Sequence, residues 1–268
     1  MAKVIITAEE ANALVGKPNV VFLDCSFDKE GKINYAEEFP KEHISGSHYF
    51  DFKKGVPPHE FIPLDLPDAP TFESYVKSFG INSDTLVVVY EKIPDAGGFL
   101  FASRVWFMFN YFGHDNVRIL EGGFTRWKNL NLPVTDASTP VPQTGNFTVN
   151  ERENKRIHYD EVKALIANNS VQILDARPPP LFQKGTLPNA INVPVGSFIK
   201  RDTMTMPSPD EILAMVKAKG VDVTKPIVTS CNSGNAASGL SSILAAAGIE
   251  SRVFVGSYTE WIKRQAKE

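Results

Sequence analysis

The stretch Pro226-Ile227-Val228-Thr229-Ser230-Cys231-Asn232-Ser233-Gly234-Asn235-Ala236-Ala237 contains the pattern that decides the fold of this chain. It begins with a short apolar run, typical of a buried strand, and a helical pattern starts at Ala236. The residues between are small and turn-prone, and Gly234 can adopt a positive φ. Cys231 therefore stands at the carboxyl end of a predicted strand, where open α/β sheets place their ligands.

A turn of this kind favours a negatively charged, reactive sulfur at Cys231. Successive backbone N–H groups of such a turn can point inward and form a nest for an anion. The partial positive charge at the start of the following helix has the same preference. Both effects stabilise a thiolate over a thiol, and both would hold the terminal anion of a persulfide. The alternative is that Cys231 is a small buried apolar residue, as free cysteines often are.

The same order of elements occurs twice in the chain. The strand before Cys231 matches residues 86–90, and residues 20–25 match residues 171–176. Residues 117–127 match residues 252–261, and both segments end in Gly-x-x-x-x-Trp. These matched endings indicate a duplication rather than a chance likeness. The helical patterns between them are followed by glycines suited to a helix C-terminus, at residues 101–112 with Gly113 and 236–247 with Gly248.

Strands that alternate with helices predict parallel pairing with right-handed crossovers. We therefore expect an α/β fold of two tandem domains, 1–136 and 156–268, each with a mostly parallel sheet flanked by helices. Residues 137–155 lie in a Pro-, Thr-, Ser-, Asn- and Gln-rich stretch without a steady period, so we expect a linker and not part of a core. The repeat aligns Glu91 with Cys231.

Composition and charge exclude several classes of function. The 268 residues are 43% hydrophobic and 22% charged, which is ordinary for two globular cores. A net charge of −3 and a pI near 6 favour neither nucleic acid nor an anionic membrane, and the apolar stretches are too short to span a bilayer. Residues 1–10 resemble neither a signal peptide nor an Arg-rich presequence, so we expect a cytoplasmic protein and leave a mitochondrial one open. With only Cys25 and Cys231, we expect free thiols.

Taken in order, these motifs resemble the tandem-domain rhodanese family, the thiosulfate and 3-mercaptopyruvate sulfurtransferases. The resemblance implies two rhodanese-like domains and a sulfurtransferase. Cys231 would take a sulfane sulfur from a mercaptopyruvate-, thiosulfate- or persulfide-type donor. It would pass that sulfur to cyanide or to a thiol, such as a thioredoxin- or glutathione-like acceptor. The resemblance implies no metal and no organic cofactor, and it makes the first domain an inactive copy because Glu91 cannot carry sulfur. The likeness rests on residues 43–47, 87–90, 103–109, 112–114, 120–127, 174–177, 190–194, 231–237 and 255–261.

The cysteine loop supplies the candidate site residues. With Cys231 as the catalytic nucleophile, Ser233 would hydrogen-bond substrate or sulfur, and it matches the mercaptopyruvate subtype together with Gly234. The loop contains no Arg or Lys, unlike that of the thiosulfate subtype. The backbone amides of the whole loop would hold the substrate anion. The substrate-binding candidates are Asn232, Ser233, Gly234, Asn235, Ala236 and Ala237.

The chain departs from the family where Leu181 stands in the place of a substrate-binding arginine. A lysine nearby does not replace a bidentate arginine clamp for a carboxylate. His59, Arg177 and Lys184 are the candidate auxiliary residues, although Arg177 is more simply the partner of a buried carboxylate and Lys184 a solvated surface charge. The missing arginine leaves the sulfur donor open.

Two other functions compete with sulfur transfer. A phosphatase of a related fold would need a Cys-x5-Arg loop, and the arginine position counted from Cys231 is Ala237, so this function is disfavoured. A weakly active or non-catalytic sulfur-sensing or sulfur-binding module is motivated by Leu181. Mass detection of one added sulfur on Cys231 separates the sulfurtransferase from both alternatives.

Overall fold

Two five-stranded sheets organise the computed structural model, which describes residues 3–93, 99–141 and 143–268. The N-terminal sheet has the strand order β1-β6-β5-β2-β4 and the C-terminal sheet the order β10-β9-β11-β12-β8. Every pairing in both sheets is parallel. The strands are β1 Ile5–Ile6, β2 Val20–Asp24, β4 Ser47–Tyr49, β5 Leu86–Tyr90 and β6 Val117–Leu120 in the first sheet, and β8 Arg156–Ile157, β9 Gln172–Asp175, β10 Ile191–Asn192, β11 Ile227–Ser230 and β12 Arg252–Phe254 in the second.

The two sheets repeat one topology, because β1, β2, β4, β5 and β6 take the same places as β8, β9, β10, β11 and β12. The α/β fold expected from the alternating pattern is confirmed, and β5 has the predicted bounds. Gly113 and Gly248 follow α4 and α9 with φ of 96° and 75°, as expected of glycines that end helices. The α-helices are α1 Ala8–Asn12, α2 Tyr35–Glu38, α3 Ala69–Lys77, α4 Phe101–Tyr111, α5 Gly123–Asn129, α6 Tyr159–Ala167, α7 Pro179–Gln183, α8 Pro209–Ala218, α9 Asn235–Ala246 and α10 Ser257–Gln265.

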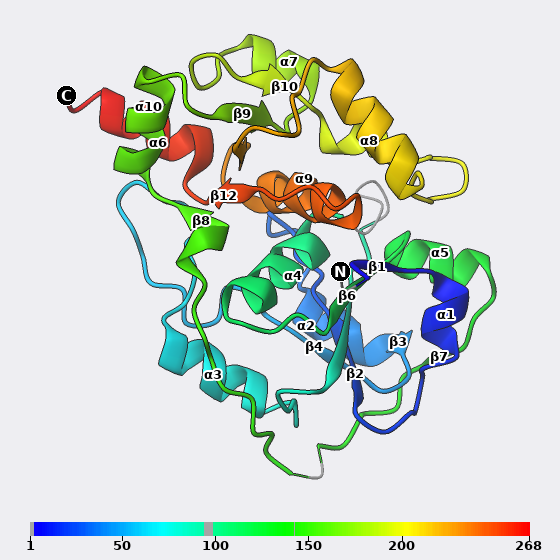
Figure 1. Ribbon diagram of the computed structural model, residues 1–268. Helices are drawn as coiled ribbons and strands as arrows, with labels where there is room; N and C mark the ends of the chain where they lie inside the picture. Colours follow the sequence, from blue (N-terminus) through cyan, green and yellow to red (C-terminus); the bar gives the residue numbers. More distant parts are fainter. Residues whose placement is uncertain (1–2, 94–98, 142) are drawn as a thin grey trace.

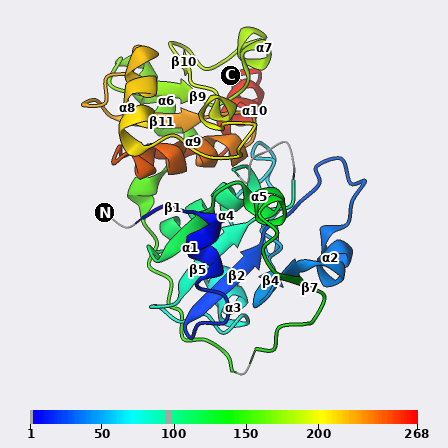
Figure 2. The ribbon, with the colours of Figure 1, turned by 90° about the vertical axis from the view of Figure 1, so that its right-hand side faces the viewer.

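Helices α4 and α9 pack against each other where the two halves meet (Figures 1 and 2). Small residues allow the close approach: a Cβ on Gly239 would lie 2.8 Å from the carbonyl oxygen of Phe99. The hydroxyl of Ser242 also donates to that of Ser103 at 3.4 Å. Helix α4 is buried along nearly its whole length because its own sheet and α9 cover it from both sides, which explains why most of its residues are apolar.

The expectation that residues 137–155 are only a linker was wrong in one respect. Phe147 is buried and lies against the rings of Phe72, Phe109 and His114 in the core of the N-terminal half. Just before this stretch, β7 (Val134–Thr135) pairs antiparallel with β3 (His43–Ile44). One aromatic residue in a polar stretch has no period, so the sequence pattern could not place it in a core.

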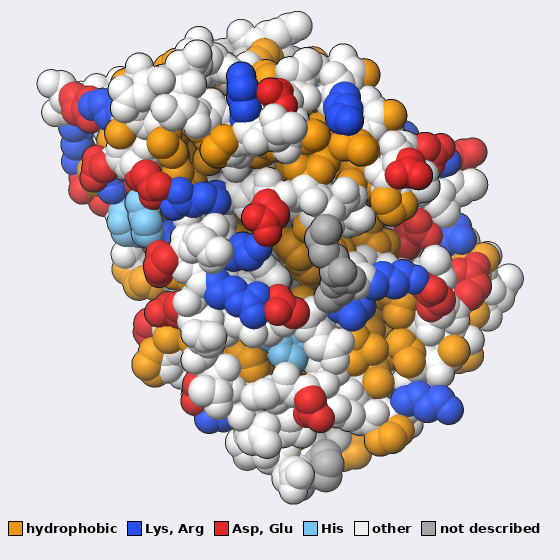
Figure 3. Space-filling view, in the orientation of Figure 1, with side chains coloured by type: hydrophobic (Ala, Val, Ile, Leu, Met, Phe, Trp, Pro, Cys, Tyr) orange, Lys and Arg blue, Asp and Glu red, His pale blue; other side chains and the backbone are white. Residues whose placement is uncertain are grey.

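Charged side chains of both signs are interspersed over the face drawn in Figure 3, and apolar side chains are visible where the two halves meet. This mixture agrees with the small net charge of the chain. Among the described residues, no helix combines the length and the apolar character needed to cross a membrane.

Candidate active site

The Cys231 loop lies at the carboxyl end of β11, between β9 and β12 at the centre of the second sheet. The strand ends at Ser230 and α9 begins at Asn235, so the loop is a single tight turn. Gly234 caps the helix with a φ of 88°. The start of a twelve-residue helix thus faces the cysteine, and its partial positive charge favours an anion there.

The sulfur of Cys231 is held inside this turn. The N–H of Gly234 donates to Sγ at 3.1 Å, and the hydroxyl oxygen of Ser257 lies 3.8 Å from Sγ. The backbone is fixed as well, because the N–H of Cys231 donates to the Ser257 Oγ at 3.1 Å and its carbonyl accepts from the N–H of Tyr258 at 3.1 Å. Only 3% of Cys231 is exposed. The turn can therefore stabilise negative charge on a sulfur that is largely removed from water.

Gly234 cannot be replaced without moving the loop. Its φ lies in the left-handed region, and a Cβ built on it would be 2.6 Å from the carbonyl oxygen of Val255 and 3.0 Å from Nη1 of Arg104. Both the conformation and the close approach require glycine. The loop is consequently clamped between its own domain, through Val255, and α4 of the other half, through Arg104.

Ser257 is a site residue that the sequence patterns did not single out. It is fully buried at the start of α10 and has a φ of 52°, an uncommon conformation for a residue other than glycine. The matched residue in the first half is Gly123, with a φ of 54°. The hydroxyl of Ser257 donates to the carbonyl oxygen of Phe254 at 2.7 Å and accepts from the N–H of Cys231. In the sequence, the sign of a special role was that Ser257 stands where the matching segment of the first half has Gly123.

The predicted loop residues differ in their surroundings. Asn232 is exposed, and its carbonyl accepts from the N–H of Thr259 at 3.2 Å, whereas Ser233 is half-buried. Asn235 is buried, and neither atom of its side-chain amide has a hydrogen-bond partner among the described residues. Ala236 and Ala237 form the first turn of α9. The loop therefore combines a fixed backbone with unpartnered polar groups.

The auxiliary candidates are not gathered around the sulfur. His59 is exposed, and its Nδ1 accepts the N–H groups of Phe61 and Ile62 in its own loop. Lys184 is exposed at the end of α7, in the same segment as Leu181, which is 44% exposed. Within the described part of the chain, no hydrogen bond or ion pair joins His59 or Lys184 to Cys231.

Arg177 is engaged in a buried ion pair. Its Nη2 lies 2.6 Å from the carboxylate of Asp175, and its Nε donates to both oxygens of that carboxylate at 3.0 and 3.1 Å. Nη2 also donates to the carbonyl oxygen of Gly185, and the guanidinium lies over the ring of Tyr258. These contacts agree with the structural role that the sequence suggested for it.

In the N-terminal half, the carboxylate of Glu91 occupies the position that matches Cys231. It accepts backbone N–H groups from Leu100 at 3.3 Å, from Phe101 at 2.5 Å and from Ala102 at 2.9 Å, at the start of α4. Burial raises the pKa of Glu91 to about 7, although these hydrogen bonds oppose the shift. The other thiol, Cys25, is also fully buried here, and its burial raises its pKa well above the ordinary value. Neither group resembles an accessible nucleophile.

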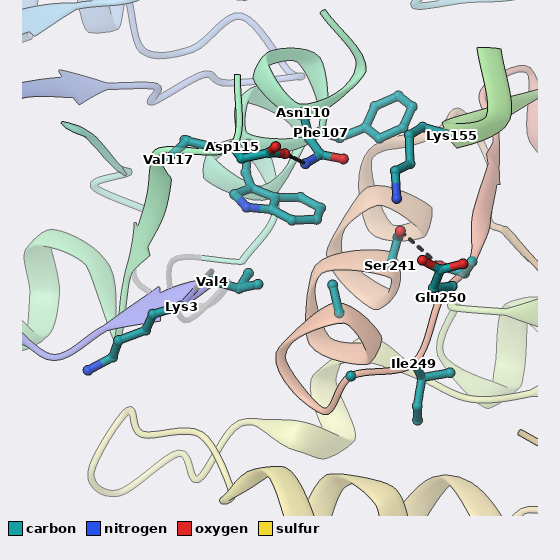
Figure 4. Close-up of a pocket in the computed structure, with 14 residues that line it drawn as sticks. Lys3, Val4, Phe107, Asn110, Asp115, Val117, Lys155, Ser241, Ile249 and Glu250 are labelled. Carbon is teal, nitrogen blue, oxygen red and sulfur yellow. Dashed lines mark hydrogen bonds between the residues drawn. The ribbon is translucent and has the colours of Figure 1, made fainter. Parts of the chain in front are cut away.

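A separate cavity of about 260 Å³ lies between the two halves (Figure 4). It is lined by residues of α4 and α9, including Phe107 and Ser241, and by Lys155 and Glu250. On one wall, Asn110 donates to Asp115 at 2.9 Å. None of the Cys231 loop residues belongs to its lining, so this cavity is distinct from the candidate active site.

Comparisons with known proteins agree with the fold and with the duplication. The rhodanese-like domain family matches residues 7–130 and 158–264. The thiosulfate sulfurtransferase of Bos taurus is 32% identical, with 97% of this chain and 91% of that protein aligned. The 3-mercaptopyruvate sulfurtransferase of Mus musculus is also 32% identical, over 86% of this chain and 80% of that protein. The crystal structure of SseA from Escherichia coli, a 3-mercaptopyruvate sulfotransferase, superposes with a TM-score of 0.84 at 26% identity and covers 96% of this chain and 99% of its own.

Proposed function

This chain belongs to the rhodanese family, and we propose that it carries sulfur on Cys231. The protein is a sulfurtransferase of the thiosulfate and 3-mercaptopyruvate type, with small-molecule sulfur donors and acceptors. One observation carries the assignment to Cys231: its Sγ accepts the Gly234 N–H at 3.1 Å at the start of α9. That geometry suits a thiolate before the transfer and a persulfide after it.

The proposed reaction has two displacement steps. In the first, the Cys231 thiolate attacks the sulfane sulfur of the donor, an S–S bond forms on the enzyme, and the donor bond to that sulfur breaks. With thiosulfate as the donor, the leaving group would be sulfite. With mercaptopyruvate, the carbon–sulfur bond would break, the methylene carbon would take up the thiol proton, and pyruvate would be released. In the second step an acceptor thiolate or cyanide attacks the outer sulfur and releases the Cys231 thiolate. The charge on the outer sulfur is stabilised throughout by the loop amides.

The choice of donor follows from Leu181. A dianionic or carboxylate donor needs cations that grip it, and Leu181 is 44% exposed at the position that matches the family's arginine. We propose that a persulfide-type donor loads Cys231 faster than thiosulfate or mercaptopyruvate. We further propose thioredoxin- or glutathione-like thiols as acceptors and a cytoplasmic location, since both Cys25 and Cys231 are free thiols suited to a reducing compartment.

Intact-mass measurement tests this function. The protein is incubated separately with thiosulfate, mercaptopyruvate and glutathione persulfide, and one added sulfur is expected in each reactive mixture. Cys231→Ser is the control and should gain none, whereas Cys25→Ser should gain sulfur as the unmodified chain does. Loss of the added sulfur on addition of glutathione or cyanide establishes transfer. A chain that gains sulfur but never releases it would be a sensing module, and a chain that gains none from any donor would contradict the proposal.

A further inference from the structure

Arg104 brings a buried cation from the N-terminal half to the Cys231 loop. It lies on α4, and only 1% of it is exposed. Its Nη2 donates to the carbonyl oxygens of Leu64 at 2.8 Å and Asp65 at 3.2 Å. Its Nη1 is buried without a hydrogen-bond partner among the described residues and would lie 3.0 Å from a Cβ on Gly234. A buried, unpartnered donor beside a catalytic turn is rare enough to need an explanation.

Arg104 has no ion-pair partner of its own among the described residues. Its neighbour Asp65 uses its carboxylate to bind Arg156, with an N–O distance of 2.7 Å, and offers Arg104 only a backbone carbonyl. No carboxylate pairs with Arg104 within residues 3–93, 99–141 and 143–268. In the C-terminal half, the buried carboxylates of Asp175 and Glu260 are already paired, with Arg177 and Arg264 respectively.

The loop, in turn, contains no cation of its own, since none of residues 231–237 is Arg or Lys. Gly234 joins the two, because its N–H donates to Sγ of Cys231 while Nη1 of Arg104 lies 3.0 Å from the point that a Cβ on Gly234 would occupy. Burial lowers the pKa of Arg104 to about 10, and negative charge on Asp65 and on Cys231 opposes that shift. The guanidinium therefore stays protonated at neutral pH.

We propose that Arg104 is a positioning residue whose charge stabilises the Cys231 thiolate, and then its persulfide, from the other half of the molecule. A buried cation without a counter-ion is costly, and the ionised sulfur supplies that counter-ion. The inference deepens the proposed sulfur transfer and rests on it for the persulfide. For the thiolate it stands on the geometry alone. In this arrangement the half without a nucleophile contributes the electrostatics that the half with the nucleophile lacks.

Alkylation of Cys231 as a function of pH tests the proposal without any sulfur donor. The rate of reaction with iodoacetamide is followed by intact mass in the full chain, in a Cys25→Ser background. Replacing Arg104 with Gln should raise the pH at which half the maximal rate is reached by about one unit, because a nearby opposite charge favours an ionised group by this order. Arg104→Lys keeps the charge and should restore most of the shift.

Arg126→Gln is the matched control. Arg126 also comes from the N-terminal half and donates to the carbonyl oxygen of Thr203 in the other half at 2.7 Å. Among the described residues, its ion pairs are with Glu9 and Glu121, and no hydrogen bond or ion pair joins it to the loop. This variant should leave the pH profile unchanged. The proposal is overturned if folded Arg104→Gln has the profile of the unmodified chain, or if Arg104→Lys shifts it as far as Arg104→Gln does.

If Arg104→Gln does not fold, a second variant still tests the proposal. Asp65→Asn removes a negative charge beside Arg104 while keeping the backbone carbonyls that hold the guanidinium. It should move the alkylation profile to lower pH, and an unchanged or raised midpoint would overturn the proposal. Sulfur loading of the same variants is read separately. A chain that takes no sulfur but has the expected profiles would contradict the proposed function and leave the role of Arg104 intact.

Discussion

In the N-terminal half the Glu91 carboxylate accepts three backbone N–H groups at the start of α4, and in the C-terminal half the Cys231 sulfur accepts one at the start of α9. Both halves thus keep a cradle for negative charge at the same point of the same topology. In the first half the site is filled permanently by the carboxyl group of Glu91, which is only partly ionised at neutral pH because burial raises its pKa to about 7. In the second it holds an atom that can react. The duplication has preserved the electrostatic site and changed its occupant.

We expect the largest effect on sulfur loading from substituting Cys231, alone or together with Glu91, since these two side chains fill the matched sites. Cys231→Ser should abolish sulfur loading, a loss on the order of a thousandfold or more, because the nucleophile is gone. Adding Glu91→Cys to that variant should not restore it, since α4 begins ten residues after Glu91, whereas α9 begins four residues after Cys231 and the loop between them forms a tight turn around the sulfur. Intact mass after incubation with glutathione persulfide checks both. Sulfur on residue 91 would show that the two cradles are interchangeable.

The second largest effect on sulfur loading is expected at Gly234, in the loop that holds the Cys231 sulfur. Gly234→Ala should slow loading by about a hundredfold, because moving the loop removes an N–H donor from the sulfur. Gly248→Ala is the matched control: it also has a positive φ and follows α9, so it carries a similar backbone cost of about 1–2 kcal/mol, but it lies away from the loop. Initial rates and thermal unfolding of both variants separate the two contributions. Equal rates in the two variants would contradict the role of Gly234.

Smaller effects are expected when the matched residues Ser257 and Gly123 are each replaced by the residue found in the other half. Ser257→Gly removes left-handed strain but also the hydroxyl that accepts the Cys231 N–H, so stability should change little while loading slows about tenfold. Gly123→Ser should destabilise the N-terminal half by about 1 kcal/mol and leave loading unaltered. Urea unfolding and loading rates measure the pair. An unaltered loading rate in Ser257→Gly would mean that the hydroxyl is dispensable.

The smallest effect on sulfur loading is expected from Glu91→Gln, which should instead change how the free energy of unfolding depends on pH. The pKa of Glu91 is raised to about 7 in the folded chain from an ordinary 4.5, so the folded state binds the proton more tightly than the unfolded state. Its contribution is therefore present below pH 4.5 and is lost as the pH rises to about 7, a change of roughly 3 kcal/mol. Glu91→Gln should flatten this decline.

Urea unfolding between pH 4.5 and 8 measures the difference. Asp24, whose pKa is also raised by burial, stays in the variant, so part of the decline should persist. Sulfur loading should remain within about twofold of the unmodified chain, because Glu91 lies in the other half. A decline as steep in Glu91→Gln as in the unmodified chain would exclude Glu91 as its source.

Much of this comparison could be predicted from the sequence. The repeated strands, the glycines after α4 and α9, and the alignment of Glu91 with Cys231 all follow from periodicity and spacing. Arg104 could not be assigned in this way, because a single arginine among aromatic residues in α4 reads as part of a packed helix. Its role depends on how the two halves dock. Ser257 was missed because a backbone conformation, rather than a residue pattern, makes it unusual.

The burial of Phe147 fixes where this protein can be divided for experiments. A fragment that stopped at residue 136 would lose a side chain that packs against Phe72 and Phe109, and emptying such a site costs about 3–5 kcal/mol. The chain also returns to α4 through Asn150, whose N–H donates to the carbonyl oxygen of Phe112 at 3.0 Å. Expression of the first half by itself, or a split reporter made from the two halves, should therefore keep the chain intact through residue 152.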